Sequence, residues 1–399
     1  MYLKLTGKQF KYLPNLSWEL NIMKVLLVNS GIFRVPPEKG GGTETHVYHL
    51  ANNLSKLGVE VHLVSDIYSK EALRKDINVY ELRALRIPLR MGFTGWVINH
   101  FLCGLYSFKK TFETMRGEVF DVIHMHGRLG PVLITILDRR IPKVYTVHDL
   151  PPWLSRYGRI EQIVRNISYI NMEVKTCRLA NYIIVVNPVI RRILVEDFKI
   201  PSWKIEFIPN GVDTDLFKPA NRKLNYCLFV GNLTWRKGLH ILLYALKKLN
   251  DEVKCLIVGE GPEKRNLVKL AEKLGLRNVV FTGALPLENL AKIYSKAGFF
   301  ILPSISEAFG LAALEAMASG CPCIVSSSSG VSKIVRDEYN GYIFKQGDID
   351  MLADKIGKLW TNSSLRRRMG ENARNTVEKY SWIKTAEKIV KIYEKQIYK

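Results

Sequence analysis

The sequence predicts an α/β protein with two doubly wound, parallel-sheet domains in tandem, and three observations lead to this prediction. Short apolar runs of strand length alternate with loops and helical segments, which is the order of a parallel sheet built from crossover connections. The 399 residues are enough for two domains, each with its own core. Hydrophobic residues make up 47% of the chain and charged residues 24%, a composition typical of globular proteins.

The N-terminal domain is expected to span residues 23–216, and residues 1–22 are interpreted as an extension before its first strand. The extension lacks the continuous apolar region of a signal peptide, because charged residues interrupt it at Lys4, Lys8, Lys11 and Glu19. The strands predicted for this domain cover residues 23–29, 59–64, 119–124, 143–147, 182–186 and 204–208.

A second series of strands predicts a C-terminal domain over residues 217–380. Its strands are expected at residues 226–230, 254–258, 279–281, 299–302 and 323–326. The segment 209–221 contains two prolines, a glycine and polar residues, so it is interpreted as the connection between the domains. No apolar stretch approaches the roughly twenty residues of a membrane-spanning helix, and a cytoplasmic protein is expected.

Two glutamates, Glu307 and Glu315, are separated by seven residues around a glycine that begins a predicted helix. This spacing can place one carboxylate in a loop and the other about two turns into the helix, with the backbone N–H groups of Phe309, Gly310 and Leu311 between them. A helix N-terminus binds anions, and carboxylates accept hydrogen bonds from hydroxyl groups. The combination favours a sugar nucleotide, whereas an isolated pair at this spacing would indicate a surface turn.

Glycine-containing loops follow several predicted strands, at the sheet edge where doubly wound proteins bind ligands. Gly41 and Gly42 follow the first strand and would let the backbone approach a pyrophosphate. The corresponding loops of the second series contain Gly231, Asn232, Gly259, Glu260 and Gly261. The last three of these suit an approach to a nucleoside and a helix cap equally well.

Taken in order, the motifs resemble those of the retaining glycosyltransferases of family 4, which have the GT-B fold and include glycogen synthases and phosphatidylinositol mannosyltransferases. The resemblance covers nearly the whole chain from Met23 onward. It rests on the paired glutamates and on the strings Gly40-Gly41-Gly42-Thr43-Glu44, Asp121-Val122-Ile123-His124, Thr146-Val147-His148-Asp149, Pro209-Asn210-Gly211-Val212-Asp213, Val230-Gly231-Asn232-Leu233, Arg236-Lys237-Gly238 and Val258-Gly259-Glu260-Gly261-Pro262. It implies two Rossmann-like domains facing across a cleft, with a final helix (381–399) that returns to the N-terminal domain.

The resemblance also implies roles on the donor side of this cleft. Transfer from a nucleotide-sugar leaves a charged diphosphate, which Lys237 and Arg236 would stabilise. Glu307 would contact hydroxyls of the donor sugar, and Glu315 those of the ribose. The family usually has an arginine directly after the first glycine of the loop, but Asn232 stands there in this chain, so Arg236 is the candidate to supply the missing charge.

On the N-terminal side, His148 matches the family's active-site histidine near the transferred sugar, and a strand-end position supports this role. His124 and His126 are expected to line the acceptor cleft. The implied reaction moves a hexosyl unit from a UDP- or GDP-linked sugar to a hydroxyl acceptor with retention of configuration. No cofactor or metal is expected, because the D-x-D string at Asp213 lies in the interdomain connection rather than beside a nucleotide loop.

The charge balance predicts attraction to a polyanion, because 59 basic residues oppose 37 acidic ones and give a formal net charge of +22. The chain has no helix-turn-helix, zinc or ribonucleoprotein signature, so nucleic acid is not expected. Residues 83–116 suit an anionic membrane surface, or equally a core helix with a solvated face. They combine aromatic residues with Arg83, Arg86, Arg90, Lys109, Lys110 and Arg116. A lipid-linked acceptor at the cytoplasmic face of a membrane is therefore expected.

Two other classes of protein are consistent with parts of this sequence. A nucleotide-sugar epimerase of the GT-B fold would share the nucleotide site but would need no acceptor. A noncatalytic protein that binds membranes or nucleic acid would account for the positive charge, but not for the glycine loops and the paired glutamates. Turnover of a donor without an acceptor would identify the first class, and failure to bind any nucleoside diphosphate would identify the second.

Overall fold

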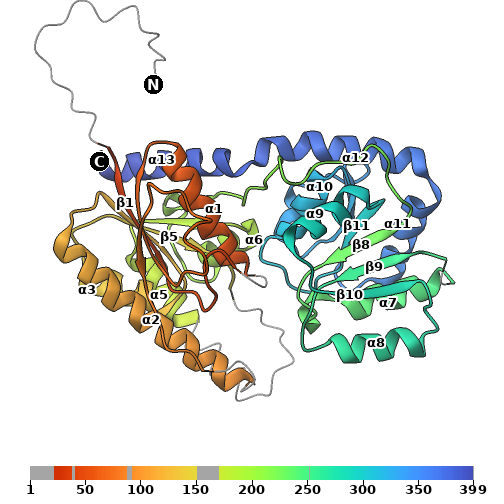
Figure 1. Cartoon of the computed structure of the whole chain (residues 1–399), viewed down its shortest axis with the longest axis horizontal. Helices are drawn as coiled ribbons and strands as arrows, with labels where there is room; N and C mark the ends of the chain where they lie inside the picture. Colours follow the sequence, from red (N-terminus) through yellow and green to blue (C-terminus); the bar gives the residue numbers. More distant parts are fainter. Residues whose placement is uncertain (1–21, 38–40, 88–91, 151–169, 251, 399) are drawn as a thin grey trace, which may run out of the picture.

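The computed structural model describes residues 22–37, 41–87, 92–150, 170–250 and 252–398, which form two parallel sheets flanked by helices (Figure 1). This arrangement confirms the predicted fold class. Some residues that the sequence analysis singled out lie outside the described residues, namely Gly40, Arg90 and, apart from Ile22, the N-terminal extension.

The first sheet is doubly wound around its central strand. Its strands are β1 (Lys24–Asn29), β2 (Glu60–Ser65), β3 (Asn78–Glu81), β4 (Val122–His126), β5 (Lys143–Val147), β6 (Tyr182–Val185) and β7 (Ile205–Phe207). The strand order is β3-β2-β1-β4-β5-β6-β7, and all neighbouring strands are parallel. The chain therefore winds outward from β1 in both directions, and the carboxyl ends of all its strands lie along one edge.

Helices cover both faces of the first sheet. They are α1 (Gly42–Lys56), α2 (Gly92–Gly117), α3 (Leu129–Leu137), α5 (Asn171–Leu179), α6 (Pro188–Glu196) and α13 (Trp382–Ile397). Successive strand residues point to opposite faces. Val25 and Leu27 of β1 pack with α1 and α13, whereas Leu26 and Val28 pack in the core that α2, α3, α5 and α6 cover.

The second sheet repeats this organisation. Its strands are β8 (Cys227–Val230), β9 (Cys255–Val258), β10 (Val279–Gly283), β11 (Phe299–Leu302), β12 (Cys323–Ser326) and β13 (Gly341–Phe344). They pair in parallel in the order β10-β9-β8-β11-β12-β13. The helices are α7 (Leu239–Lys248), α8 (Lys264–Lys273), α9 (Leu287–Lys296), α10 (Leu311–Ala318), α11 (Ile349–Thr361) and α12 (Ser363–Val377). One core joins α7, α8 and α11 to the sheet, and the other joins α9, α10 and α12.

The end of the chain returns to the first sheet. In Figure 1, α12 and α13 form a helical arm along one side of the molecule, with α12 beside the second sheet and α13 beside the first. Ile389 and Tyr393 of α13 are buried in the core of the first sheet. Residues from both ends of the described chain therefore share one core.

The two chain segments that pass between the sheets touch each other. Val212 forms a parallel bridge with Ser381, and its N–H donates to the Tyr380 carbonyl oxygen at 2.9 Å. At Gly211, an added Cβ would lie 2.5 Å from backbone atoms of Trp382, so only glycine fits there. The two segments that connect the sheets therefore pass side by side at this point.

The structure differs from the predicted strands in three places. Strands β3 and β13 are additional, and both are short edge strands of four residues. Strand β4 begins at Val122, because Val119 is 86% exposed, and it continues through His124 to His126. The two histidines are fully buried and hydrogen-bonded, which is how a strand interior accommodates them.

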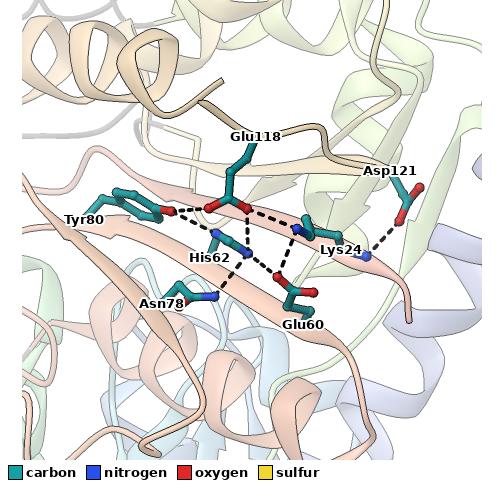
Figure 2. Close-up of polar contacts among 7 residues, drawn as sticks. All are labelled: Lys24, Glu60, His62, Asn78, Tyr80, Glu118 and Asp121. Atoms are coloured by element: carbon teal, nitrogen blue, oxygen red, sulfur yellow. Dashed lines mark hydrogen bonds and ion pairs between the residues drawn. The ribbon is translucent and has the colours of Figure 1, made fainter. Parts of the chain in front are cut away.

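A polar cluster closes the amino-terminal edge of the first sheet (Figure 2). The Lys24 ammonium group lies 3.1 Å from carboxylate oxygens of both Glu60 and Glu118. His62 Nε2 lies 2.8 Å from Glu60, and the Tyr80 hydroxyl donates to Glu118 at 3.0 Å. These contacts join β1, β2, β3 and the segment before β4 at the edge opposite the predicted binding loops.

Among the described residues, no helix has both the length and the apolar character that would let it cross a bilayer.

Candidate functional site

The loops after β8 and β9 are packed against each other by their glycines. Gly259 has φ +139°, and a Cβ there would lie 2.0 Å from the carbonyl oxygen of Gly231. Gly261 meets Leu233 in the same way, since its Cβ would lie 2.4 Å from the Leu233 carbonyl oxygen. Backbone packing between the two loops therefore requires these glycines and holds both loops at the carboxyl edge of the second sheet.

The polar residues of these two loops face outward. Asn232 and Glu260 are exposed, and the Glu260 carboxylate accepts a hydrogen bond of 2.6 Å from Lys264 in the first turn of α8. The structure brings neither residue into contact with the paired glutamates. They lie at the rim of the loops rather than in the buried part of the site.

A short helical turn after β8, η4 (Trp235–Lys237), brings Lys237 to Glu307 in the loop after β11. The Lys237 ammonium group donates to Glu307 Oε2, and the Ser304 hydroxyl lies 3.4 Å from the same oxygen. Arg236 is exposed, and its guanidinium donates to the Ser306 carbonyl oxygen at 3.3 Å. The Lys237 and Glu307 side chains are only 13% and 9% exposed, so water screens this ion pair weakly.

The environment keeps Glu307 ionised. Burial by itself would raise the pKa of this carboxyl, but the nearby charges of Lys237 and Arg236, with the hydrogen bonds from Lys237 and Ser304, hold the pKa below its ordinary value. A buried, ionised carboxylate beside two cations can accept hydrogen bonds from hydroxyl groups while the cations attract an anion.

Helix α10 begins just beyond Glu307. Gly310 precedes it in the left-handed conformation, with φ +104°, and a Cβ there would lie 2.9 Å from Leu302 Cδ2. Among the described residues, no side chain caps this helix, so its first-turn N–H groups at Leu311 and Ala312 have no capping acceptor. The helix N-terminus is therefore an anion-binding position next to the Lys237–Glu307 pair.

Glu315 lies in the second turn of α10 and has a different environment from Glu307. Burial raises its pKa to about 7, and the neighbouring Tyr294 opposes this shift only in part. Tyr294 itself is fully buried in α9. The two carboxyl groups therefore differ, because the pKa of Glu307 is held below its ordinary value whereas that of Glu315 is raised into the neutral range.

Three histidines meet at the carboxyl edge of the first sheet. His126 ends β4, and its Nδ1 lies 2.9 Å from Nε2 of His148, which follows β5. His46 of α1 lies beside both, and its Nδ1 is bonded to Asn210 Oδ1 at 2.7 Å. Burial lowers the pKa of all three, for His46 to about 4, so they are neutral at pH 7.

His124 has a structural position rather than the expected place in the acceptor cleft. Its Nδ1 lies 2.5 Å from the Tyr393 hydroxyl of α13, and its Nε2 lies 2.7 Å from the Thr146 hydroxyl. The side chain is fully buried, and both ring nitrogens are used. His124 therefore ties the returning helix to the sheet, whereas its neighbour His126 contacts His148.

A small cavity lies beside His148, lined by Thr43, Gly127, Arg128, Thr146, His148, Asp149 and Glu173. Arg128 connects the two carboxylates, with its guanidinium 2.7 Å from Asp149 and 3.2 Å from Glu173. The Tyr145 hydroxyl donates to Glu173 at 2.6 Å. Burial raises the pKa of Glu173 to about 7, although Arg128 opposes it. The lining of the cavity is therefore polar and includes an ion-paired arginine.

The glycine loop after β1 leads into α1. Gly41 has φ +131°, and a Cβ there would lie 2.7 Å from a carboxylate oxygen of Glu44. A Cβ at Gly42 would have no heavy atom of the described chain within 4 Å. Gly41 is therefore required by the local backbone, while Gly42 leaves open space at the start of the helix.

One contact joins the two halves of the site. Asn187 begins α6, and its side-chain oxygen accepts from the Val189 N–H at 2.8 Å. Its side-chain NH₂ group lies 3.4 Å from the Glu307 carbonyl oxygen on the second sheet. The carboxyl ends of both sheets therefore face each other with Glu307 at the boundary.

Several residues of this arrangement were not predicted from the sequence. His46, Arg128, Glu173 and Asn187 belong to no motif that indicated them as ligands. His46 follows the glycine loop by one helical turn, and Asn187 directly follows β6 with a proline after it, which is a helix-capping signal. Glu173 carries no such signal, because its partners Arg128 and Tyr145 are distant in the sequence.

Two protein-family models together match most of the chain. The model described as Glycosyltransferase Family 4 matches residues 40–216, and the model described as Glycosyl transferases group 1 matches residues 213–376. The chain is 28% identical to an uncharacterized glycosyltransferase of Methanocaldococcus jannaschii, over 93% of this chain and 98% of that protein. It is also 28% identical to an MMP alpha-(1->4)-mannosyltransferase of Mycolicibacterium hassiacum, over 90% of this chain and 95% of that protein. The identity is likewise 28% to a D-inositol 3-phosphate glycosyltransferase of Corynebacterium aurimucosum, over 88% of this chain and 90% of that protein.

Solved structures have the same fold. A sucrose-phosphate synthase from Thermosynechococcus elongatus superposes with a TM-score of 0.75 at 22% identity, covering 94% of this chain and 99% of that one. Anabaena HepE in complex with UDP-glucose superposes with a TM-score of 0.70 at 19% identity, covering 94% and 100%. Both similarities extend over the two sheets and the loops between them.

Proposed function

Since the chain belongs to the family 4 glycosyltransferases of the GT-B fold, we propose that it moves a hexosyl unit from a UDP- or GDP-linked sugar to a hydroxyl acceptor with retention of configuration. The halves of the enzyme would be residues 23–216 with 381–399 on the acceptor side, and residues 217–380 on the donor side. The observation that carries this proposal is the buried Lys237–Glu307 pair beside the uncapped N-terminus of α10.

The donor site follows from the charges of these groups. The diphosphate would lie at the first turn of α10, where the backbone N–H groups of Leu311 and Ala312 and the cations Lys237 and Arg236 attract it. Glu307 would accept hydrogen bonds from the sugar hydroxyls, and Glu315 would accept them from the ribose. The loops at Gly231 and Gly259 would approach the nucleoside.

Transfer on one face of the sugar needs no protein nucleophile. The bond from the anomeric carbon to the phosphate oxygen breaks, and the acceptor oxygen bonds to that carbon from the same side. The acceptor proton passes to the leaving phosphate oxygen, so atoms and charge balance. Lys237, Arg236 and the α10 dipole stabilise the charge that develops on the diphosphate, which is where an enzyme of this type gains rate.

The acceptor would bind on the first sheet, beside His148. The adjacent cavity is lined by charged and hydrogen-bonding groups from Asp149, Arg128 and Glu173, and such a lining suits a polyhydroxylated acceptor. The neutral ring of His148 can donate or accept a hydrogen bond with a sugar hydroxyl. His126 would hold that ring in place through their shared hydrogen bond.

Thermal melting in the presence of nucleotide-sugars tests the donor assignment. The true donor should stabilise the protein by about 2.7 kcal/mol at one hundred times its dissociation constant. Glu315→Gln should reduce this stabilisation, whereas the control Glu288→Gln, an exposed glutamate of α9, should not. A protein that no nucleoside diphosphate stabilises would contradict the proposal. Turnover of the donor at an equal rate without acceptor would indicate an epimerase instead.

The surface of α2 and α3 supports a lipid-linked acceptor at an anionic membrane. The two helices pack side by side (Figure 1). Phe101 and Leu105 of α2 are 52% and 38% exposed, and Leu137 of α3 is 61% exposed. Exposed basic residues accompany them at Lys109, Arg116, Arg139 and Arg140. Other aromatic residues of α2, Phe108 and Phe112, pack against the core, so one face of the helix belongs to the core and the exposed face would contact the membrane.

Vesicle sedimentation tests this second part of the proposal. Each lysine or arginine near an anionic leaflet contributes about 1 kcal/mol, so binding should be strong at low salt and weaken steeply as salt rises. Replacing Phe101 and Leu105 together by serine should weaken binding, whereas Leu287→Ser, an equally exposed residue on α9, should not. Equal activity on a soluble acceptor, with no sedimentation on anionic vesicles, would contradict it.

A further inference from the structure

Three histidines from separate elements converge at the carboxyl edge of the first sheet. His46 belongs to α1, His126 ends β4, and His148 follows β5. Each offers one ring nitrogen such that all three nitrogens lie within 4.8 Å of one another. His46 and His126 are 1% and 0% exposed, and His148 is half-buried. The group therefore forms a compact set of imidazole ligands.

The hydrogen bonds of this group leave ring nitrogens without partners. His46 Nδ1 must donate its hydrogen to Asn210, because the amide oxygen Oδ1 can only accept. His46 Nε2 therefore carries a lone pair, and in the described part of the chain this buried atom has no hydrogen-bond partner. His126 Nε2 is buried and unpartnered in the same way. Buried polar atoms normally have partners, so two in one cluster indicate that the cluster accepts something else.

We propose that His46, His126 and His148 form a binding site for a first-row transition metal ion such as Zn²⁺, and that the bound metal blocks glycosyl transfer. Neutral imidazole is a preferred ligand of this class of ion. Tetrahedral coordination with Zn–N bonds of about 2.0–2.1 Å places ligand nitrogens roughly 3.3 Å apart. The ligand nitrogens of the three histidines lie within 4.8 Å of one another, so rotations of the rings would bring them to this spacing.

The surroundings supply the other parts of such a site. A metal-bound histidine usually donates its second ring N–H to a protein oxygen, which orients the ring, and Asn210 Oδ1 does this for His46. Three protein ligands leave a fourth position for water, as in catalytic rather than structural zinc sites. Because His148 is half-buried and lies beside the cavity, this fourth position would face the proposed acceptor cleft.

The second group with similar ligands is a matched control. Glu60, His62 and Glu118 also lie within 4.8 Å of one another, at the opposite edge of the sheet (Figure 2). The Lys24 ammonium group lies between the two carboxylates, and both nitrogens of His62 have hydrogen-bond partners. A cation would have to displace Lys24 to bind there, so this group is expected to remain free of metal.

Metal binding is measured directly with the full-length protein, expressed without a histidine tag. Addition of Co²⁺ should produce the visible absorption bands of a four-coordinate ion at one equivalent, and Zn²⁺ should abolish them. His46→Gln and His148→Gln should each weaken binding by about tenfold or more, on the scale of a lost metal interaction. Glu118→Gln should leave it unchanged. Since His46 is buried and its variant is at risk of unfolding, circular dichroism accompanies each variant, and the half-buried His148 gives an independent test.

Two results would overturn the site. One is the absence of a Co²⁺ spectrum and of Zn²⁺ binding in calorimetry. The other is binding that survives both histidine substitutions but is lost in Glu118→Gln, which would place the metal at the control group.

The inhibitory effect rests on the proposed role of His148 and is tested separately. Zn²⁺ should lower the transfer rate over the same concentration range in which it binds, and a chelator should restore the rate. Binding without inhibition would refute the block and count against His148 at the reaction centre, while leaving the metal site in place. Absence of transfer in the metal-free enzyme would contradict the proposed function but not the binding result.

Discussion

Replacing Lys237 by alanine should lower turnover at saturating donor about 10²- to 10³-fold. The proposal places the Lys237 ammonium group next to the leaving diphosphate, where it stabilises charge that grows in the transition state. Removal of one such preorganised group costs about 2.7–4 kcal/mol of transition-state stabilisation. The effect should appear in the turnover number rather than only in the KM of the donor, because the charge on the bridging oxygen grows as the bond breaks.

The same substitution also acts on folding stability, and the structure allows the two effects to be separated. Lys237 and Glu307 are mostly buried, so the variant leaves Glu307 without its counter-charge. Removing one partner of a buried ion pair costs about 3–5 kcal/mol. Without Lys237, burial dominates and the pKa of Glu307 should rise, so the stability loss should increase as the pH rises above the ordinary pKa of a glutamate.

The double variant Lys237→Ala with Glu307→Gln distinguishes the two roles. It removes both charges, so melting temperature should recover toward the wild-type value. Turnover should remain low, because neither the cation nor the sugar-binding carboxylate is present. Turnover is measured with saturating donor and acceptor at a temperature where melting curves show every variant folded. Wild-type turnover in Lys237→Ala, or recovery of turnover together with stability in the double variant, would refute the catalytic assignment.

Three further predictions concern other parts of the molecule. Because burial raises the pKa of Glu315 to about 7, protonation of this carboxyl should weaken donor binding as the pH falls through 7, and Glu315→Gln should remove this pH dependence. A wild-type dissociation constant for the donor that is constant between pH 6 and 8 would contradict this prediction. The two halves should close around the donor by hinging where residues 209–221 touch Ser381. The radius of gyration in X-ray scattering should therefore fall when donor is added, and identical scattering profiles with and without donor would argue against closure. Deletion of residues 1–22 should leave melting temperature and activity intact, and a truncated chain that fails to fold would show that these residues are structural.

Most strands were predictable because both faces of the two sheets are covered by helices. A strand buried on both sides is a nearly continuous apolar run, such as Val25 to Val28, and it is recognisable without any partner. The edge strands β3 and β13 were missed, since Asn78–Glu81 and Gly341–Phe344 mix polar, aromatic and glycine residues. The strand predicted at residues 119–124 ends two residues before the end of β4 at His126, and hydrogen bonds explain why both His124 and His126 are buried in the strand.

The candidate site was predictable only in its local parts. The glycine loops and the spacing of Glu307 and Glu315 are properties of contiguous sequence, and they predict a nucleotide-sugar site at the strand ends. Sequence alone did not distinguish His124, which is held by Tyr393, from His126, which contacts His148. The two residues are of the same type and lie two apart in one strand, so they point to the same face of the sheet. What separates them is their position along the strand, because α13 contacts His124 whereas His126 lies at the strand end beside His148.

The α/β class, the two parallel sheets and the family were predictable from the sequence alone, because each depends on short-range patterns of apolar residues, glycines and carboxylates. Which side chains meet depends on the tertiary structure. The sequence separation is 70 residues between Lys237 and Glu307 and 120 residues between Asn187 and Glu307. Both pairs come together only because parallel strands place the loops that follow them along one edge of each sheet. The electrostatic state of the site has the same origin, since the low pKa of Glu307 and the raised pKa of Glu315 depend on burial and on charges supplied by other loops.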